Sequence, residues 1–195
     1  MRSALLAFFI SFAFTTATRT TTHHRTFAMS PTAAFQLIPR RGPKPNTTNK
    51  LPHSQLDGHG PEYIAKKLHD YCFSTWPGQV VSEQSGISVP GARAMVLHRD
   101  CQCHSNKNAF MVGREFAHIH PYPDLGSMHL TLSPKDAKYV IDQGWGEDHY
   151  LVSQGHWAKG LVMIFSPRDD DELEQLKAIV ARSFEFATGS SSSSS

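Results

Sequence analysis

Three histidines, two acids and an arginine fall within the seventeen residues REFAHIHPYPDLGSMHL, numbered 114–130. These side chains are Arg114, Glu115, His118, His120, Asp124 and His129. Imidazoles bind metal ions and exchange protons near neutral pH, and a guanidinium can hold an anion. The stretch therefore predicts a metal site, an acid/base site or merely a polar pair of strands.

The spacing of the histidines is typical of two short strands joined by a Pro/Gly turn. His118 and His120 alternate with apolar residues, and His129 lies between Met128 and Leu130. Successive strand residues point to opposite faces of a sheet. If Met128 and Leu130 enter the core, all three imidazoles share the other face, which would be a pocket wall or lie in solvent.

One interpretation is a metal site. His118, His120 and His129 would be ligands to zinc or iron, and Asp124 or Glu115 would be a fourth partner. One open position for water would then allow hydrolase or lyase chemistry.

A second interpretation needs no metal. His118 or His120 takes a proton from a weakly acidic substrate, and Arg114 holds the resulting anion. Glu115 or Asp124 would set the tautomer of a histidine. The remaining interpretations involve no chemistry: the histidines cap strand ends, or they hold a small molecule in a secreted binding protein.

Hydrophobic periodicity predicts a single α+β domain over residues 59–188, with an antiparallel or mixed sheet and helices packed on one face. A hairpin is expected between the strands at 92–98 and 109–112, which flank a polar loop containing Cys101 and Cys103. The predicted helices are 61–76, 133–144 and 169–188. The predicted strands are 80–81, 92–98, 109–112, 116–120, 128–132 and 160–167.

The two ends of the chain differ in composition from this domain. Residues 1–17 contain Arg2 and a mainly apolar run from Ala4 to Phe14, which predicts a cleaved signal peptide and a secreted protein. A membrane tether and an organelle transit peptide are the alternatives, and no stable membrane span is expected. Residues 18–58, rich in Thr and Pro, are expected to be a disordered linker, and residues 189–195 a disordered serine tail.

Charge and motifs exclude several classes of partner. The formal charge of the chain is +2, and no cluster of Lys and Arg is interleaved with aromatic residues in the domain, so no nucleic-acid partner is expected. No phosphate-binding glycine loop and no dinucleotide fingerprint occurs. A small molecule remains as the expected partner.

Four motifs together resemble the luciferase domain of fungal bioluminescence and its non-luminous relatives. They are Arg-Glu-x-Ala-His-x-His at 114–120 with Asp124, His129-Leu130, Gly-Trp-Gly at 144–146 with His149, and Pro-Arg followed by acids at 167–172. The resemblance extends over about residues 60–188 and is strongest from residue 113 onward.

The resemblance implies an oxygenase-like oxidoreductase of secondary metabolism. The fungal luciferase adds molecular oxygen to 3-hydroxyhispidin, so the resemblance implies deprotonation of an enolisable aromatic substrate, with no cofactor beyond oxygen. It places the catalytic residues among those already named, and it adds Trp145, His149 and Arg168 as expected substrate contacts. Light emission does not follow from the resemblance and is not expected.

Overall fold

The computed structural model describes residues 35–101 and 103–190. The expected signal peptide, the first part of the linker and the end of the serine tail lie outside the described residues. The described helices are α1 (Glu62–Ser74), α2 (Pro134–Asp142), α3 (Tyr150–Ser153) and α4 (Asp170–Thr188), with a short 3-10 turn at Lys107–Ala109. The described strands are β1 (Val80–Gln84), β2 (Arg93–Leu97), β3 (Glu115–Ile119), β4 (Met128–Thr131), β5 (Gly146–Asp148) and β6 (Leu161–Ile164).

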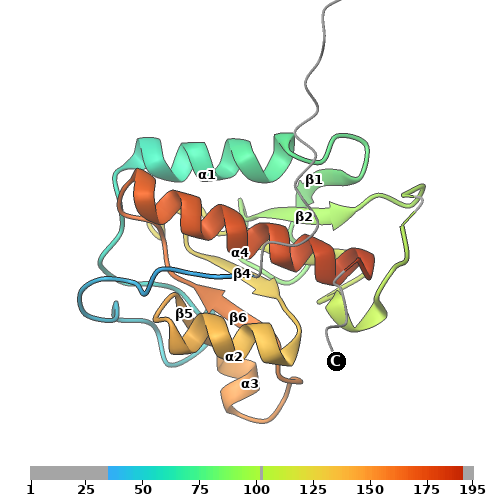
Figure 1. Cartoon of the computed structure of the whole chain (residues 1–195). Coiled ribbons are helices and arrows are strands. Elements are labelled where there is room, and N and C mark those ends of the chain that lie inside the picture. The colour runs from blue at the N-terminus through green and yellow to red at the C-terminus, as the bar shows by residue number, and fades with distance from the viewer. Residues whose placement is uncertain (1–34, 102, 191–195) are drawn as a thin grey trace, which may run out of the picture. The chain divides into compact units, whose positions relative to one another are not determined.

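The described strands form one antiparallel sheet in the order β1-β2-β3-β4-β6-β5. Helices α1 and α4 run side by side across one face of this sheet, and α2 lies beside them (Figure 1). The predicted α+β class is therefore confirmed, and the sheet is antiparallel.

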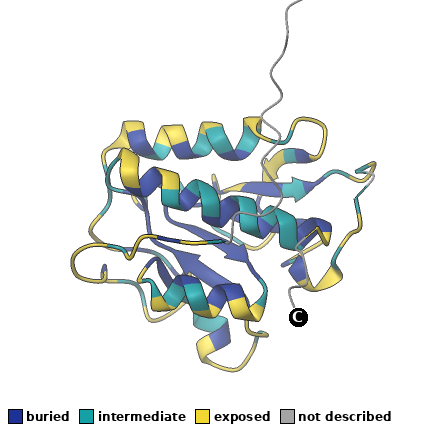
Figure 2. Cartoon of the chain, in the orientation of Figure 1, coloured by how far each residue is buried: buried dark blue, intermediate teal, exposed yellow. Residues whose placement is uncertain are grey.

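The hydrophobic core lies between the sheet and these helices. Met128 and Leu130 of β4 stand directly opposite Ile164 and Val162 of β6, and all four side chains are buried. They belong to one buried cluster with apolar residues of α1 and α4. Each such side chain contributes about 1.5–3 kcal/mol through burial. Strands β3, β4 and β6 are buried at every residue, whereas β1 at the edge of the sheet is mostly exposed (Figure 2).

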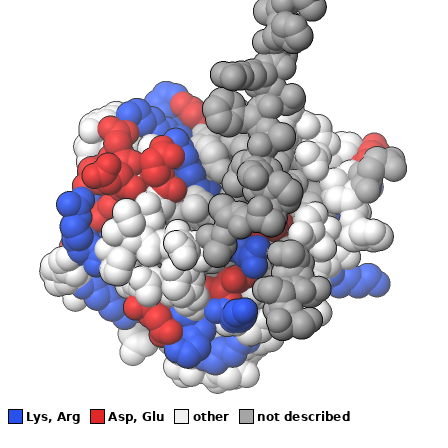
Figure 3. All heavy atoms as spheres, viewed as in Figure 1, with Lys and Arg blue, Asp and Glu red and all other residues white. Residues whose placement is uncertain are grey.

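Local sequence signals fix the starts of α2 and α4. The Ser133 hydroxyl accepts a hydrogen bond from the Asp136 amide at the start of α2, and the Asp169 carboxylate accepts one from the Glu172 amide at the start of α4. Acidic atoms gather over the beginning of α4, bordered by basic atoms (Figure 3). One ion pair there, 2.7 Å between Lys67 and Asp170, joins α1 to α4.

The hairpin expected between residues 92–98 and 109–112 is not formed. Residues 107–109 form a 3-10 turn, and β2 pairs with β3 instead. Asn106 begins this turn by accepting a hydrogen bond from the amide of Asn108. A polar side chain that caps a turn thus outweighs the short apolar run AFMV, which by itself is typical of a strand.

Strand β3 holds one residue more than the part of β2 that faces it. Met95 and Val96 are consecutive in β2, yet they pair with Ala117 and Glu115, so Phe116 has no partner opposite. Such a β-bulge changes the direction of side chains beside it. It allows the Glu115 carboxylate to contact His118, with 2.8 Å between Oε1 and Nδ1, although residues three apart on a regular strand face opposite ways.

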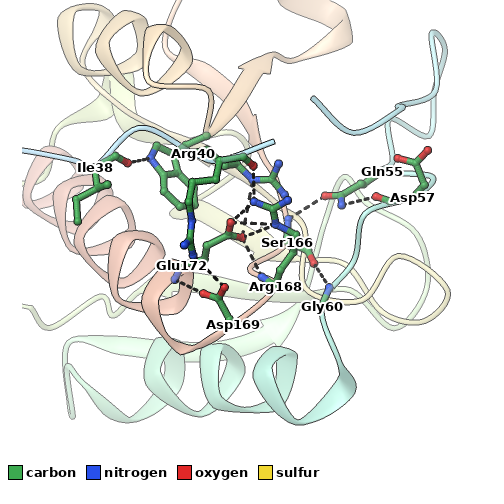
Figure 4. A network of polar contacts seen from close by, with 11 residues as sticks. Ile38, Arg40, Gln55, Asp57, Gly60, Ser166, Arg168, Asp169 and Glu172 are labelled. Atoms are coloured by element: carbon green, nitrogen blue, oxygen red, sulfur yellow. Dashed lines mark hydrogen bonds and ion pairs between the residues drawn. The ribbon is translucent and has the colours of Figure 1, made fainter. Parts of the chain in front are cut away.

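Residues 35–58, expected as part of a disordered linker, lie against the domain in the structure. The amide of Leu37 donates to the Tyr139 hydroxyl, and the Trp145 indole donates to the carbonyl of Ile38. Gln55 is buried, and its side-chain oxygen accepts a hydrogen bond of 2.8 Å from the Ser166 amide (Figure 4). The folded unit therefore begins well before the predicted boundary at residue 59.

Two of the three cysteines form a disulfide, Cys101 with Cys103, and Cys72 is a free, buried thiol on α1. Burial raises the pKa of the Cys72 thiol far above its ordinary value, which keeps it protonated. Separately, none of the helices in the described ranges has the length and apolar character needed to cross a membrane.

We predict that Gln55→Ala destabilises the protein by about 1–3 kcal/mol, because the buried amide of Ser166 loses its acceptor. Chemical denaturation followed by circular dichroism would measure this loss. The matched control is Gln154→Ala, since Gln154 is exposed and, among the described residues, its side chain forms a hydrogen bond to Ser153 alone. Equal stability of the two variants would show that the segment around Gln55 is not part of the folded unit.

Candidate active site

A row of side chains crosses the sheet face opposite the helices. His118 of β3 stands directly opposite His129 of β4, His129 opposite Met163 of β6, and Met163 opposite Glu147 of β5. His120 follows the end of β3, where its amide donates to the carbonyl of Ser127. The prediction that His118 and His129 share the face opposite Met128 and Leu130 is confirmed.

These histidines line a cavity of about 340 Å³. His53 and His149 also line it, so five imidazoles meet there, and all five residues are buried. Ring centroids of His129 lie 4.3 Å from His149, 4.6 Å from His120 and 5.0 Å from His118. The remaining wall is mostly apolar and includes Leu51, Ile87, Met111, Leu151, Trp157 and Leu161.

Glu115 anchors the first histidine of the row. Its carboxylate accepts hydrogen bonds from the Ser85 hydroxyl at 2.8 Å, the Gly86 amide at 2.9 Å and His118 Nδ1 at 2.8 Å. Burial raises the pKa of Glu115, but these three donors outweigh burial and leave the pKa below its ordinary value. Glu115 is thus an anion that holds the proton of His118 on Nδ1.

The contact between His118 and His129 follows from that tautomer. Burial lowers the pKa of His118, so the ring is neutral and its Nε2 offers a lone pair. His129 Nδ1 lies 3.0 Å away and donates to it. Burial also lowers the pKa of His129 well below its ordinary value, and the neighbouring imidazoles lower it further. His129 Nε2 is buried and has no hydrogen-bond partner among the residues that the structure describes.

Asp124 anchors the second histidine in the same way. Its Oδ2 lies 2.8 Å from His120 Nδ1 and accepts a hydrogen bond of 2.9 Å from the Gln55 amide. The Ser127 hydroxyl lies 2.9 Å from the same ring nitrogen. Burial raises the pKa of Asp124, but hydrogen bonds from His120, Ser127 and the Gln55 amide outweigh burial and lower it. The backbone at Gln55 therefore helps to orient His120.

His53 and His149 carry their protons on Nε2, unlike His118 and His120, because backbone amides contact their Nδ1 atoms. His53 Nδ1 accepts from the Tyr150 amide at 3.2 Å, and its Nε2 donates to Glu147 at 3.0 Å. His149 Nδ1 accepts from the Leu151 amide at 3.1 Å, which leaves its proton on Nε2. Burial, with the neighbouring imidazoles, lowers the pKa of His149 to about 4. Both rings are neutral donors through Nε2.

Arg114 does not lie with the histidines, contrary to expectation. Its Nε donates to the carbonyl of Leu97 at 2.8 Å and its Nη2 to that of His98 at 3.2 Å, while the guanidinium lies over the Phe110 ring. Arg114 therefore fixes the end of β2 to the start of β3. The sequence pattern could not show this, because a long side chain can turn along the sheet as readily as across it.

Trp145 and Arg168, expected to contact substrate, also lie away from the histidine cavity. Trp145 is buried in the hydrophobic core. Arg168 forms an ion pair with Glu172, its Nη2 donates to the carbonyl of Arg41, and Arg40 lies in the same polar network (Figure 4). Of the three expected substrate contacts, His149 alone lines the cavity.

Sequence reasoning missed His53 and Glu147 as members of the site. His53 belongs to a Pro-rich segment without periodicity, and no motif marked it. Glu147 lies in the matched motif around Trp145, but its strand of three residues is too short for a pattern to detect. The only available signal was compositional: His53 is one of 12 histidines in 195 residues.

The site lies within a recognised family region. Residues 113–183 match the family model described as the luciferase domain, and this range contains His118, His120, His129 and His149. The chain therefore contains a region of the luciferase-domain family at residues 113–183. The expectation of a luciferase-type domain is confirmed, and His53 lies outside the matched range.

Luciferases of fungi are similar to this chain at modest identity. The luciferase of Armillaria gallica is 25% identical over 172 residues, which cover 78% of this chain and 61% of that protein. The luciferases of Armillaria mellea and Neonothopanus nambi are 35% and 33% identical over 81 residues, or 38% of this chain. Those 81 residues cover only 29% and 28% of the two relatives. No solved structure matches the chain significantly.

Glu147 gives a prediction on pH dependence. Burial raises its pKa, but hydrogen bonds from His53, Lys44 and Thr47 outweigh burial and lower it to about 2. A carboxyl with a lowered pKa stabilises the fold above its unfolded value, near 4.5, and this contribution is lost as pH falls toward 2.

We therefore expect Glu147→Gln to destabilise the protein by about 1–3 kcal/mol at pH 7 and by progressively less between pH 4.5 and 2. Denaturation of both proteins across this pH range would measure the difference. Glu83→Gln, at an exposed position of β1, is the control and should show no such difference. A destabilisation by Glu147→Gln that stays constant over the range would contradict the role of the Glu147 charge.

Proposed function

We propose that the histidine cavity is the active site of an oxygenase-like enzyme that acts on an enolisable aromatic small molecule. The observation that carries the proposal is the group of five buried imidazoles on one side of a largely apolar cavity, where burial lowers the pKa of His118, His129 and His149. Neutral imidazoles can accept or donate protons to a bound molecule, and the apolar wall excludes water. The similarity to fungal luciferases supports this chemistry.

The proposed reaction balances without an organic cofactor. An imidazole of the cavity takes the enol proton, and the substrate carbon gives an electron pair to molecular oxygen. One carbon–oxygen bond forms, and the terminal oxygen of the resulting peroxide takes the proton back. The sum is substrate and oxygen giving a hydroperoxide, so no external reductant is needed.

His149 suits the charge that develops in this reaction. Its Nε2 carries a proton, and the ring lines the cavity 4.3 Å from the His129 ring. A fixed donor of this kind stabilises the enolate oxygen in a site from which water is excluded. Arg114 was expected to stabilise this anion, but it lies outside the cavity. A neutral donor, His149, takes this role in the proposed reaction.

The cavity volume and wall indicate the size and polarity of the substrate. A volume of about 340 Å³ lies at the lower end of the range for small-molecule sites. Leu51 and Ile87 line the cavity and are 52% and 48% exposed, so they form an apolar rim. A flat ring system with one or two hydroxyl groups matches apolar walls with polar imidazoles at one side.

We predict that His129→Ala lowers kcat/KM at least about 100-fold, because it removes the imidazole at the centre of the cluster. Oxygen uptake during turnover of a library of phenols, pyrones and related enols would measure the effect. The control is His156→Ala, at an exposed histidine in the same region of the chain, which should keep full activity. Binding of library members without oxygen uptake by the wild type would support a binding protein and contradict the proposal.

A second prediction concerns the rim. Ile87→Asp should raise KM for an apolar aromatic substrate about tenfold with kcat nearly unchanged, because it replaces apolar contact by a hydrated charge. Leu56→Asp is the matched control, since Leu56 is 59% exposed and does not line the cavity. If both substitutions changed KM equally, substrate would not enter past Ile87.

A further inference from the structure

We propose that His118, His120 and His129 bind one divalent transition-metal ion, and that this ion is part of the active site. This inference rests on the proposed function for its role but on geometry for its existence. One nitrogen from each of these rings lies within 4.8 Å of the others. In a tetrahedral zinc site, nitrogen atoms about 2.0–2.1 Å from the ion lie about 3.3 Å from each other. The rings are therefore close to the required arrangement.

The hydrogen bonds on the outer side of two rings are those that metal ligands require. Glu115 holds the Nδ1 proton of His118, and Asp124 lies 2.8 Å from Nδ1 of His120. Both contacts leave Nε2 as the metal-binding atom of the ring. Carboxylates placed in this way fix the ring and make the opposite nitrogen a stronger ligand. Two carboxylate–histidine pairs side by side are more than orientation of a single base requires.

The contact between His118 and His129 is compatible with an ion. His118 Nε2 and His129 Nδ1 lie 3.0 Å apart and share one proton as they stand. Both atoms offer lone pairs once the Nδ1 proton of His129 moves to its Nε2, which is buried and has no hydrogen-bond partner among the described residues, so the ring stays neutral. A metal ion that replaces the proton needs the two nitrogen atoms to separate by only a few tenths of an ångström.

The charge around the cluster also favours a cation. Glu115 and Asp124 are buried, with 3% and 7% side-chain exposure. Among the described residues, neither forms an ion pair with a lysine or an arginine, and their ion-pair partners are histidines. Buried carboxylates are costly unless a positive charge lies nearby. A divalent ion among the three imidazoles supplies two positive charges next to both acids.

The other candidate group, His53 with His129 and His149, is less suited. Both nitrogens of His53 already have hydrogen-bond partners, Tyr150 and Glu147. His149 accepts a backbone hydrogen bond at Nδ1, so its Nε2 carries the proton and has no free lone pair. These two rings are therefore expected outside the ligand set. His149 can donate from Nε2 to a molecule bound at the open position of the ion, whereas the Nε2 proton of His53 is already donated to Glu147.

In this arrangement the ion binds the enol oxygen of the substrate. A metal-bound hydroxyl group is more acidic than a free one, so the ion helps to form the enolate that reacts with oxygen. The oxygen added and the proton returned are the same as in the proposed reaction. The structure thus assigns three histidines to the ion and one, His149, to the substrate.

The test is metal analysis of the full chain, purified without chelator and also reconstituted with Zn²⁺, Fe²⁺ or Co²⁺ after chelation. We expect one ion per chain by inductively coupled plasma mass spectrometry and visible d–d absorption with Co²⁺. His118→Ala, His120→Ala and His129→Ala should each lose the ion, whereas His53→Ala and His149→Ala should keep it. Failure of the folded wild type to bind any of the three metals, or loss of the ion in the last two variants alone, would overturn the assignment.

A milder substitution keeps the test valid if the alanine variants fail to fold. Glu115→Gln retains all three ligands and should weaken Zn²⁺ binding about 10–100-fold, whereas Glu83→Gln on β1 should not change it. Equal affinity in both variants would contradict the metal site.

The two proposals can fail separately. Turnover by metal-free protein would show that the ion has no part in the reaction and would leave the enzyme. A bound ion in a protein that turns over no substrate would contradict the proposed enzymatic function and leave the metal site.

Discussion

Two buried contacts between a carboxylate and an imidazole determine how this face of the sheet is built. Glu115 with His118 and Asp124 with His120 place two acids where water does not reach. Without partners, such groups would cost several kcal/mol each. Every neighbouring element contributes a donor: the Ser85–Gly86 turn to Glu115, and the segment before α1, through the Gln55 amide, to Asp124. The polar face is therefore stable only as a complete set.

This dependence explains why the chain before α1 is part of the folded unit. His53 and Gln55 lie in a segment without hydrophobic periodicity, and propensity alone does not favour order there. The segment is ordered by groups that it completes: Gln55 satisfies Asp124 and the Ser166 amide, and His53 satisfies Glu147. Tertiary hydrogen bonds of this kind connect residues about 70 to 110 positions apart, so no local pattern could reveal them.

The features that could be predicted from the sequence were those set by residues two or three positions apart along the chain. Alternation placed His118 and His129 on one face because strand geometry repeats every two residues. The starts of α2 and α4 could be predicted, because the side chains of Ser133 and Asp169 accept hydrogen bonds from amides only three residues further along the chain. The bulge at Phe116 could not be predicted, because it depends on how β2 pairs with β3. The contact of Glu115 with His118 depends on this bulge, so it could not be predicted either. The prediction for Arg114 was wrong for the same reason. Its guanidinium is held by carbonyl groups of β2 and of the loop after β2, and the pairing of β2 with β3 brings these groups close.

The imidazoles differ in which ring nitrogen carries the proton, and the group that contacts Nδ1 decides this. That group is a carboxylate for two rings and a backbone amide for two others. His118 and His120 have carboxylates at Nδ1, which leave a lone pair on Nε2, and in His118 this lone pair accepts a hydrogen bond from His129 Nδ1. His53 and His149 accept backbone amides at Nδ1, which leave a proton on Nε2. His129 lies between these two pairs of rings, in ring contact with both. A molecule in the cavity therefore meets acceptors on one side and donors on the other. This polarity suits an enol, which loses a proton at one atom while negative charge grows on its oxygen. A cluster that served only to fill the sheet face would gain nothing from such a division.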